Sequence, residues 1–358
     1  MKKKILISTG GTGGHVIPAT IFYDHLKDDC DVILTTDKRG VKFLKKDHYN
    51  QKIINTPKLS KNLFLFPLVI LKILFLIIQN LFFFKKKKIE ILISTGGYMS
   101  LPLCIAAKIL GTRIILFEPN MVLGRTNKFF LKISNKIIFY SNLIKNFPNK
   151  YQNKMILIEK LLRKEFYSAN IIETKVIKDK IKLLIIGGSQ GAKLFDTILQ
   201  NTLIQLSNRY KIKVYQQTNN QNYQGLKNFF IKNDIENYLF DFDEKIIELI
   251  TNVDLCITRA GASTLSELTF LNIPYLAIPL PTAKDNHQFE NAKFYENKNC
   301  CWLINQKDIN HENLLNKLLD IIQNKEDYQL KKNNMKKFSY QNSWNKINQK
   351  LMDVINEN

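Results

Sequence analysis

A glycine-rich turn between an apolar stretch and a helical pattern occurs once in each half of the 358-residue sequence. The first turn runs from Gly10 to His15 (Gly-Gly-Thr-Gly-Gly-His) and the second from Gly187 to Ala192 (Gly-Gly-Ser-Gln-Gly-Ala). Glycine allows a tight turn and lets a ligand approach the backbone closely. The helix that follows presents N–H groups and its positive dipole end, which favour phosphate. The two turns therefore predict a phosphorylated ligand, bound in a cleft between two α/β domains.

The first turn offers two candidate chemistries. His15 follows it directly, so its imidazole starts a predicted helix, where it could act as a general base or simply pack or cap. Asp37 ends the second strand-like run, residues 32–37, about where an acid binds ribose in a dinucleotide site. The first turn alone therefore leaves an NAD-dependent oxidoreductase open.

A third small-residue turn lies in residues 258–267 and enters another predicted helix. Ser263 to Ser266 can cap that helix or bind an oxygen-rich ligand. Glu267 lies about one turn into the helix, where a carboxylate can accept two hydrogen bonds from ribose hydroxyls. The same residues would be purely structural if they formed a capping box. Downstream, residues 285–292 begin a helix whose polar start suits sugar hydroxyls, or is an ordinary polar helix end.

Short apolar runs alternate with helical patterns in both halves, which predicts parallel, doubly wound sheets. Strands are expected near 4–8, 31–36, 91–95, 113–117, 137–140, 182–186, 212–217, 237–240, 254–257, 275–278 and 301–304. Helices are expected to begin near His15, Ser100, Gly124, Asn142, Ala192, Glu244, Ser263, His287 and Asn310. The domain boundary is expected near 160–180, and a last helix from 339 to about 355 is expected to pack back across the interface.

The positive charge is concentrated in the first half. The formal net charge is +22, and residues 1–163 carry 28 Lys and Arg against 9 Asp and Glu. Unless this is compositional drift, it indicates a domain that faces a polyanion, either nucleic acid or an anionic membrane. The five cysteines form no C-x-x-C pair, and three lie in apolar runs, so we expect reduced, buried thiols in a cytosolic protein.

Residues 58–88 favour a membrane over nucleic acid as the partner. They carry seven lysines and no acids around a very apolar core, whereas nucleic-acid binding needs basic residues interleaved with polar and stacking groups. The run is long enough to span a bilayer. However, the runs 5–8 and 91–94 look like neighbours in one sheet, and a single span would separate them. We expect an interfacial anchor with snorkelling lysines; a core helix and a true span are the alternatives.

Six motifs occur in the order in which one glycosyltransferase family has them. They are Gly10–His15, Gly96–Ser100, Glu118-Pro119-Asn120 with Asn127-Lys128, Gly187–Ala192, Arg259–Glu267 and Asp285–Asn291. Together they resemble the MurG family, the N-acetylglucosaminyltransferases that convert lipid I to lipid II in peptidoglycan synthesis. The resemblance implies a GT-B fold, with two doubly wound Rossmann-like domains facing across a cleft. Residues 1–163 would bind the acceptor and associate with the membrane, residues 164–338 would bind the UDP-sugar, and the C-terminal helix 339–356 would pack back onto the first domain.

The resemblance also implies a reaction and a location. N-acetylglucosamine would pass from UDP-N-acetylglucosamine, with inversion, to the 4-hydroxyl of lipid I (undecaprenyl-pyrophosphoryl-N-acetylmuramoyl-pentapeptide). The enzyme would be peripheral on the cytoplasmic side of the bacterial inner membrane, docked on anionic lipid through residues 58–88, with no nucleic-acid partner. No Asp-x-Asp pair or His/Cys cluster lies in the segments that would meet the diphosphate, so we expect no required metal and no cofactor.

Candidate site residues follow from the matched motifs. We expect His15 to be the general base, assisted through Glu118 or Asn120. The substrate-binding residues implied by the resemblance are Thr12, Gly13, Gly14, Tyr98, Asn120, Asn127, Arg163, Ser189, Gln190, Asp243, Ala262, Ser263, Thr264, Leu265, Ser266, Glu267, Gln288 and Asn291. Of these, Arg163 and Ser189 would approach the donor diphosphate, and the backbone near Asp243 would contact the uracil. Residues 262–267 would hold diphosphate and ribose, and Gln288 with Asn291 would contact the sugar.

The chain departs from the family pattern at three places. Residues 159–163, Glu-Lys-Leu-Leu-Arg, replace the usual Gly-Asn-Pro-Val-Arg, which keeps Arg163 but changes the linker. Pro119 and His287 stand where glutamine is usual.

Three competing hypotheses are a GT-B transferase for another lipid acceptor such as diacylglycerol, the oxidoreductase, and a non-catalytic protein that binds the membrane surface.

Overall fold

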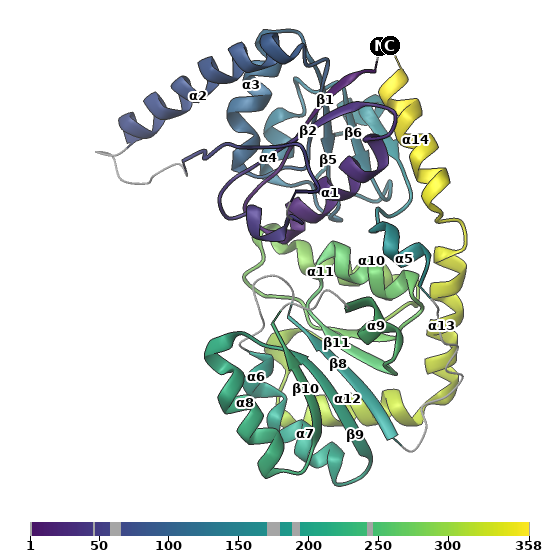
Figure 1. Cartoon of the computed structure of the whole chain (residues 1–358). Coiled ribbons are helices and arrows are strands. Elements are labelled where there is room, and N and C mark those ends of the chain that lie inside the picture. The colour runs from purple at the N-terminus through teal and green to yellow at the C-terminus, as the bar shows by residue number, and fades with distance from the viewer. Residues whose placement is uncertain are drawn as a thin grey trace. The chain divides into compact units, whose positions relative to one another are not determined.

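The computed structural model describes residues 2–45, 47–57, 66–169, 180–187, 194–241 and 246–357 (Figure 1). The chain divides into two compact units. Unit 1 comprises residues 1–164 and 342–358, and unit 2 comprises residues 165–341. Each unit is built on one parallel sheet, so the prediction of two doubly wound, Rossmann-like domains of the GT-B class is confirmed.

Unit 1 contains a seven-stranded parallel sheet in the order β3-β2-β1-β4-β5-β6-β7. Its strands are β1 (Lys4–Ser8), β2 (Asp31–Thr36), β3 (Gln51–Ile53), β4 (Ile91–Ser94), β5 (Arg113–Phe117), β6 (Lys136–Phe139) and β7 (Met155–Leu157). The central strands β1 and β4 are buried, as strands of a parallel sheet covered on both faces must be, which explains their unbroken apolar runs.

The chain order reverses between β1 and β4. From β1 the chain proceeds to β2 and β3 on one side, and β4 then pairs with the other side of β1, from Ile5 with Ile91 to Ser8 with Ser94. The two turns that follow these strands lie side by side, because the N–H of Thr95 donates to the carbonyl of Ser8 at 3.0 Å. In open α/β sheets, ligands bind outside the carboxyl ends of the strands at such a reversal.

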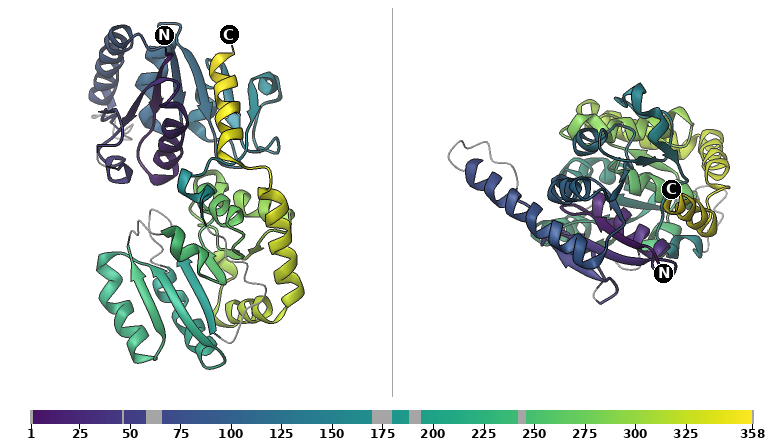
Figure 2. Two further views of the ribbon diagram at one scale, coloured as in Figure 1. Left: turned by 45° about the vertical axis from the view of Figure 1, so that its right-hand side comes forward. Right: turned by 90° about the horizontal axis from the view of Figure 1, so that it is seen from above.

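Crossovers between parallel strands are almost always right-handed, so crossovers that run in opposite directions from this reversal place helices on both faces of the sheet. Helix α1 (Gly13–Leu26) packs against α14 (Trp344–Asn356), and α2 (Phe66–Lys87) packs against α3 (Leu101–Ile109). Seen from above, α2 extends away from the body of unit 1 (Figure 2). The remaining helical segments are α4 (Arg125–Phe130), the short turns η1 (Val41–Phe43), η2 (Tyr98–Ser100) and η3 (Asn149–Lys154), and α5 (Lys164–Tyr167), which crosses the boundary between the units.

The C-terminal helix α14 belongs to unit 1. Its buried residues recur at helical spacing and form one apolar face: Ile347, Leu351, Val354 and Ile355. Trp344, at the start of the helix, stacks on His25 of α1 with the ring centroids 3.5 Å apart. Glu159 pairs with Lys346 at 3.1 Å and with Lys350 at 3.0 Å. The chain therefore returns to unit 1 through apolar packing reinforced by an ion-pair cluster.

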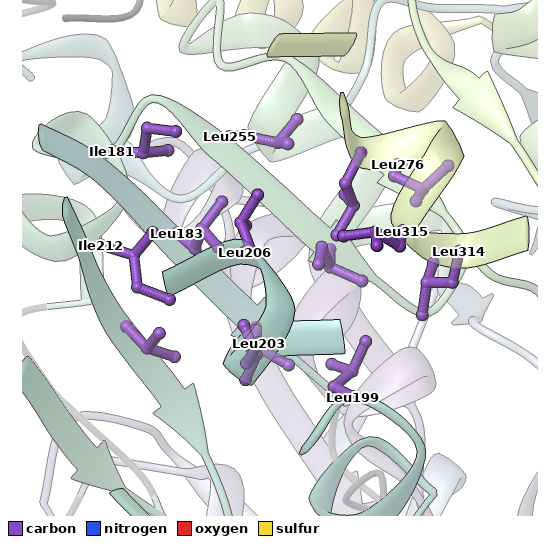
Figure 3. Packing of buried hydrophobic residues seen from close by; sticks show 14 of the residues in the cluster. Ile181, Leu183, Leu199, Leu203, Leu206, Ile212, Leu255, Leu276, Leu314 and Leu315 are labelled. Carbon is purple, nitrogen blue, oxygen red and sulfur yellow. The ribbon is translucent and has the colours of Figure 1, made fainter. Parts of the chain in front are cut away.

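Unit 2 contains a six-stranded parallel sheet in the order β10-β9-β8-β11-β12-β13, with its reversal between β8 and β11. Its strands are β8 (Lys180–Ile186), β9 (Lys211–Gln217), β10 (Glu236–Phe240), β11 (Leu255–Thr258), β12 (Tyr275–Ala277) and β13 (Trp302–Leu303). Its helices are α6 (Phe195–Ile198), α7 (Gln200–Ser207), α8 (Asn220–Lys232), α9 (Ile246–Thr251), α10 (Ala262–Phe270), α11 (His287–Asn297), α12 (His311–Gln323) and α13 (Lys325–Ser339), with the turns η4 (Lys284–Asn286) and η5 (Gln306–Asp308). Side chains of β8, α7 and α12, such as Leu183, Leu203 and Leu314, form one apolar core (Figure 3).

Two expectations about the elements were wrong. No helix begins at Asn142, because residues 141–148 run as an irregular segment before η3. The last helix, expected from 339 to about 355, is α14, but it begins only at Trp344, with Ser343 as a side-chain N-cap, because Ser339 ends the separate helix α13. The edge strands β3 and β7 were not predicted, because each is only three residues long.

The burial of His25 predicts a loss of stability in acid. Its side chain is 2% exposed, and burial lowers its pKa from the ordinary 6.5 to about 4. Between these values the unfolded chain binds a proton that the folded chain does not, so the free energy of unfolding falls as the pH falls. Between pH 7 and pH 5 we expect a loss of roughly 2 kcal/mol from this residue, which His25→Phe removes while it keeps the stacking.

Urea unfolding at the two pH values, followed by Trp344 fluorescence in a Trp302→Phe background, measures this effect. Other titrating groups affect both proteins equally, so the difference between the wild type and His25→Phe isolates His25. An equal loss in both proteins would contradict a neutral, buried imidazole.

Candidate active site

The turn after β1, residues 9–12 (the β1 turn), carries the first glycine motif of the sequence. Gly11 has a φ of +88°, a region that favours glycine. Its N–H donates to Oδ1 of Asp37 at 2.9 Å, so the end of β2 fastens the turn. Helix α1 begins at Gly13, and among the described residues no side chain caps it and no acid lies in its first turn.

His15 lies half-buried in the first turn of α1. Its Nδ1 is 2.8 Å from the carbonyl oxygen of Thr95, which follows β4. A carbonyl oxygen only accepts hydrogen bonds, so Nδ1 carries the proton and Nε2 carries the lone pair of the neutral ring. This is the tautomer that a general base acting through Nε2 requires.

Two glycines of the turn after β4, residues 95–98 (the β4 turn), lie against the imidazole. Gly96 and Gly97 have φ angles of +90° and +83°. A Cβ atom on Gly96 would lie 3.4 Å from Cε1 of His15, and one on Gly97 would lie 3.6 Å from Cδ2. The backbone of the β4 turn therefore covers the ring, and a side chain at either position would be strained.

Glu118, directly after β5, organises a neighbouring loop. It is 3% exposed, and its carboxylate accepts four hydrogen bonds. Oε1 accepts from the N–H of Asn120 at 3.2 Å and from its Nδ2 at 2.8 Å. Oε2 accepts from the N–H of Gly124 at 2.8 Å and from Nδ2 of Asn127 at 3.0 Å. The structure thus brings the predicted residues Glu118, Asn120 and Asn127 together.

Gly96 links this loop to the histidine. The same hypothetical Cβ atom that approaches His15 would lie 3.7 Å from Nδ2 of Asn127. Gly96 therefore lies between the imidazole of His15 and the amide of Asn127. Three turns, after β1, β4 and β5, meet at the carboxyl edge of three neighbouring strands.

The carboxylate of Asp37 is engaged in hydrogen bonds to other residues of unit 1. It is 4% exposed, and it accepts the N–H groups of Gly11 and Gly40, both at 2.9 Å, and two N–H groups of Arg39 at 2.9 and 2.8 Å. Burial alone would raise its pKa, but the bonds from Gly11, Arg39 and Gly40 outweigh burial and lower the pKa. Arg39 also donates to the hydroxyl of Tyr98. A carboxylate committed in this way is a poor ribose acceptor, which argues against the oxidoreductase hypothesis.

In unit 2, α10 begins at the end of β11 without a capping box. Gly261 is the N-cap, and among the described residues no side chain caps this helix. Ala262, Ser263, Thr264 and Glu267 are half-exposed, whereas the side chains of Leu265 and Ser266 are buried. The hydroxyl of Ser266 donates to the carbonyl of Ala262 at 2.7 Å and bonds Tyr295 at 3.1 Å. The capping-box alternative is therefore wrong.

Two predicted sugar-binding residues of α11 hold the turn after β11. Oε1 of Gln288 accepts the N–H groups of Ala260 at 3.2 Å and Leu280 at 2.9 Å. Nδ2 of Asn291, which is 2% exposed, donates to the carbonyl of Ala260 at 3.2 Å. With Oε1 occupied twice, Gln288 must use Nε2 for any ligand. Nδ1 of His287 bonds the carbonyl of Lys284 at 2.7 Å.

Of four other predicted site residues, the structure describes only Arg163. Ser189, Gln190 and Asp243 lie outside the described residues, as do Lys58 to Leu65 of the basic apolar segment. Arg163 is half-buried and lies at the end of the first segment of unit 1, which closes at Lys164.

Three residues of these turns had no role in the sequence interpretation. Arg259, 7% exposed at the end of β11, donates to the carbonyls of Ile278 at 3.1 Å and Pro279 at 3.3 Å, and burial lowers its pKa. Thr95 acts through its carbonyl, which no side-chain pattern reveals. Arg39 lies two residues after Asp37, and that spacing is the one signal in the sequence that could have indicated the pair.

Helix α2 is mostly solvent-exposed. It is long and apolar enough to cross a membrane by length and composition, but only 17% of its most apolar window is buried. Leu68, Leu71, Phe75 and Phe82 are between 58% and 71% exposed. The alternative of an ordinary core helix is therefore wrong. An exposed apolar surface of this kind is typical of a site that binds another protein or a membrane.

All five cysteines are free and buried, as predicted. Burial raises the pKa of Cys300 to about 11 and that of Cys104 to about 12. These thiols are therefore packing residues at neutral pH.

Comparison with known families decides the class of this site. Residues 5–139 match the model of the glycosyltransferase family 28 N-terminal domain, and residues 182–348 match that of the family 28 C-terminal domain. The chain belongs to glycosyltransferase family 28. It is a hexosyltransferase, so the oxidoreductase hypothesis and the non-catalytic hypothesis are wrong.

Curated relatives are similar over nine-tenths or more of the chain. A UDP-N-acetylglucosamine--N-acetylmuramyl-(pentapeptide) pyrophosphoryl-undecaprenol N-acetylglucosamine transferase of Pelagibacter ubique is 58% identical over 358 residues and covers 100% of both chains. The protein of the same name from Rickettsia bellii is 35% identical over 329 residues, covering 90% of this chain and 91% of its own. The resemblance to the MurG family is thus confirmed.

Solved structures show the same fold. The crystal structure of Acinetobacter baumannii MurG matches with a TM-score of 0.76 at 24% identity, covering 99% of each chain. A glycosyltransferase from Rickettsia africae matches with a TM-score of 0.66 at 16% identity, covering 99% of this chain and 97% of its own.

The buried carboxylate of Glu118 predicts a large effect of a nearly isosteric substitution. Glu118→Gln replaces one acceptor oxygen by an NH2 group that faces N–H donors, so we expect the free energy of unfolding of unit 1 to fall by about 2–4 kcal/mol. Urea unfolding followed by Trp344 fluorescence measures it. The exposed Asp28→Asn is the matched control and should change stability by less than about 0.5 kcal/mol; an equally small effect of Glu118→Gln would contradict the role assigned to this carboxylate.

Proposed function

We propose that this protein transfers N-acetylglucosamine from UDP-N-acetylglucosamine to the 4-hydroxyl of the N-acetylmuramoyl-pentapeptide of lipid I, with inversion, and so forms lipid II for the cell wall. The observation that carries the proposal is full-length similarity, at 58% identity, to a transferase named for this donor and acceptor. The His15 site gives the proposal a mechanism.

Unit 1 supplies the base in this proposal. The acceptor 4-hydroxyl attacks the anomeric carbon of the donor, its proton passes to Nε2 of His15, and the bond from that carbon to the diphosphate oxygen breaks, so that UDP leaves from the opposite face. Donation from Nδ1 to Thr95 keeps Nε2 as the basic atom. Thr12, Gly13, Gly14 and Asn120 would contact the acceptor.

Glu118 positions Asn120 and Asn127 in this scheme and does not itself take the proton. Its carboxylate already accepts four hydrogen bonds from the loop that it holds. The amide of Asn127 lies across Gly96 from the imidazole, so this loop supports the β4 turn that covers His15. Tyr98, whose hydroxyl accepts from Arg39, belongs to the same supporting structure.

Unit 2 holds the donor in this proposal. The uncapped N-terminus of α10 favours a diphosphate and the charge that develops on departing UDP. Ser263 and Thr264 lie half-exposed in its first turn, and Glu267 would accept hydrogen bonds from ribose. Nε2 of Gln288 would donate to the sugar, while Asn291 and the buried Leu265 and Ser266 hold the turn. Arg163, Ser189, Gln190 and Asp243 complete the donor contacts implied by family membership.

The base is tested by His15→Ala. General base catalysis contributes roughly 100- to 10,000-fold, so we expect kcat to fall by about that factor while the Kd for UDP changes by less than about twofold. The measurement is UDP release from UDP-N-acetylglucosamine with a lipid I analogue, with calorimetry for UDP binding. His48→Ala, which removes an exposed histidine of the same unit, is the matched control.

Each outcome of this assay is informative. Near-normal turnover of His15→Ala would remove it as the base. A wild-type protein that releases no UDP with the lipid I analogue, but does so with diacylglycerol, would replace the acceptor and favour the alternative transferase.

Helix α2 is the proposed membrane anchor of this peripheral enzyme, on the cytoplasmic side of the inner membrane. Its exposed apolar side chains would enter the interface, and the exposed Lys85 to Lys88 at its C-terminal end would meet anionic headgroups. Each lysine near an anionic surface contributes about 1 kcal/mol. Lys72 lies within the helix and is exposed, as expected for a helix that lies in the interface with its lysines reaching water.

Charge removal tests the anchor. Replacing Lys85 to Lys88 with glutamine should lower binding to vesicles that contain anionic lipid by more than about tenfold in sedimentation, and should barely change turnover of a short-chain, soluble acceptor. The matched control replaces four exposed lysines of unit 2, Lys211, Lys232, Lys298 and Lys325, with glutamine. Equal losses for the two variants would show that net charge, and not α2, attracts the protein to lipid.

A further inference from the structure

We infer that Arg39 is a positioning residue for the transfer reaction: through Asp37 and Tyr98 it clamps the β1 and β4 turns together and so fixes the imidazole of His15 between them. The inference rests on the proposed function, in which His15 is the base. Asp37 and Arg39 follow β2, whereas Tyr98 belongs to the β4 turn, so the clamp joins two separate segments of unit 1.

The first half of the clamp joins β2 to the β1 turn. Oδ1 of Asp37 accepts from the N–H of Gly11 at 2.9 Å and from that of Gly40 at 2.9 Å. Oδ2 accepts from Nε and Nη2 of Arg39 at 2.9 and 2.8 Å. A Cβ atom on Gly10 would lie 2.7 Å from Cγ of Met99 and 3.3 Å from Oδ1 of Asp37, so the β1 turn has no room to shift.

The second half joins Arg39 to the β4 turn. Its Nη2 donates to the hydroxyl of Tyr98, and its guanidinium carbon lies 5.2 Å from the centre of the Tyr98 ring. The guanidinium also lies against the β1 turn, because a Cβ atom on Gly11 would come within 3.4 Å of Nη2. One planar group therefore contacts both turns.

The clamp reaches the histidine through the backbone. Tyr98 directly follows Gly96 and Gly97, the residues whose backbone covers the imidazole, and Thr95, whose carbonyl accepts from Nδ1, begins the same turn. His15 itself starts the helix that the β1 turn enters. If the two turns separate, the bond from Nδ1 and the direction of Nε2 both change.

Lysine cannot replace Arg39 in this role. The guanidinium uses two N–H groups in a fixed plane for Asp37 and shares one of those nitrogens with Tyr98, whereas a lysine ammonium is a point charge on a flexible stem. The Asp37 side chain is 6% exposed, so this pair is not an ordinary surface salt bridge even though 44% of the Arg39 side chain is exposed.

The test is steady-state kinetics of Arg39→Lys, Tyr98→Phe and the double variant, with the lipid I analogue and UDP-N-acetylglucosamine. A displacement of about 1 Å costs about 100-fold, so we expect kcat to fall between about 10- and 100-fold in Arg39→Lys and less in Tyr98→Phe. The KM values for donor and acceptor should stay within about twofold. The double variant should lose less than the product of the single losses, because both act through one contact.

Two control variants match the changes in chemistry. Lys38→Ala removes the neighbouring exposed cation, and Tyr151→Phe removes a tyrosine hydroxyl from η3, next to the opposite edge of the sheet. Both should keep the kcat of the wild type. Thermal melting and the stoichiometry of UDP binding establish that each variant is folded at the assay temperature.

Three results would overturn the inference. The first is an Arg39→Lys variant with unchanged kcat and KM. The second is a raised KM for the acceptor with kcat unchanged, which would make Arg39 a direct ligand of the substrate. The third is a loss of kcat fully matched by a loss of folded protein. Failure of the proposed function is distinct, because it would show in the wild type as no UDP release or in His15→Ala as undiminished turnover.

Discussion

One hydrogen bond, from Nδ1 of His15 to the carbonyl of Thr95, is the contact on which the proposed mechanism in unit 1 depends. It exists because β1 and β4 pair in parallel and in register, so that their turns lie side by side where the chain order reverses. It decides which ring nitrogen is basic. The glycines of the β4 turn allow the backbone to approach the ring closely enough to make it. The tautomer of His15 therefore depends both on the pairing of β1 with β4 and on the glycines of the β4 turn.

Buried carboxylates fix the loops at strand ends in both units, and in the proposed mechanism they position other residues without taking the proton. Asp37 and Glu118 each follow a strand of unit 1. Asp37 accepts the N–H of Gly11 and N–H groups of its own loop, and Glu118 accepts N–H groups of the loop that follows it. In unit 2, Asp196 is 6% exposed and accepts from Gln216, Thr218 and Asn222 at 2.9, 3.1 and 2.7 Å. A buried carboxylate is tolerated only when such donors surround it. These acids convert flexible connections at strand ends into fixed positions for other residues.

The sequence predicted the sheets well because buried parallel strands leave unbroken apolar runs, as β1, β4 and β8 do. It failed at the irregular segment after β6, and it placed the start of the last helix at 339 instead of Trp344. Within the site, His15 and Glu118 were predicted by motif. Their geometry was not, because Thr95 acts through its backbone and Arg39 through a partner on another turn. The tasks of Gln288 and Ser266, which hold turns, also depend on contacts that no spacing reveals.

The most direct measurement of the central claim is the tautomer of His15 in solution. Long-range proton–nitrogen correlation spectra of the ¹⁵N-labelled protein, with His15→Gln used to assign the resonance, distinguish a protonated from an unprotonated ring nitrogen. At a pH where the ring is neutral, the account predicts a proton on Nδ1 and none on Nε2. A neutral ring that carries its proton on Nε2 would contradict it, because such a ring could not accept the proton of the acceptor hydroxyl through that atom.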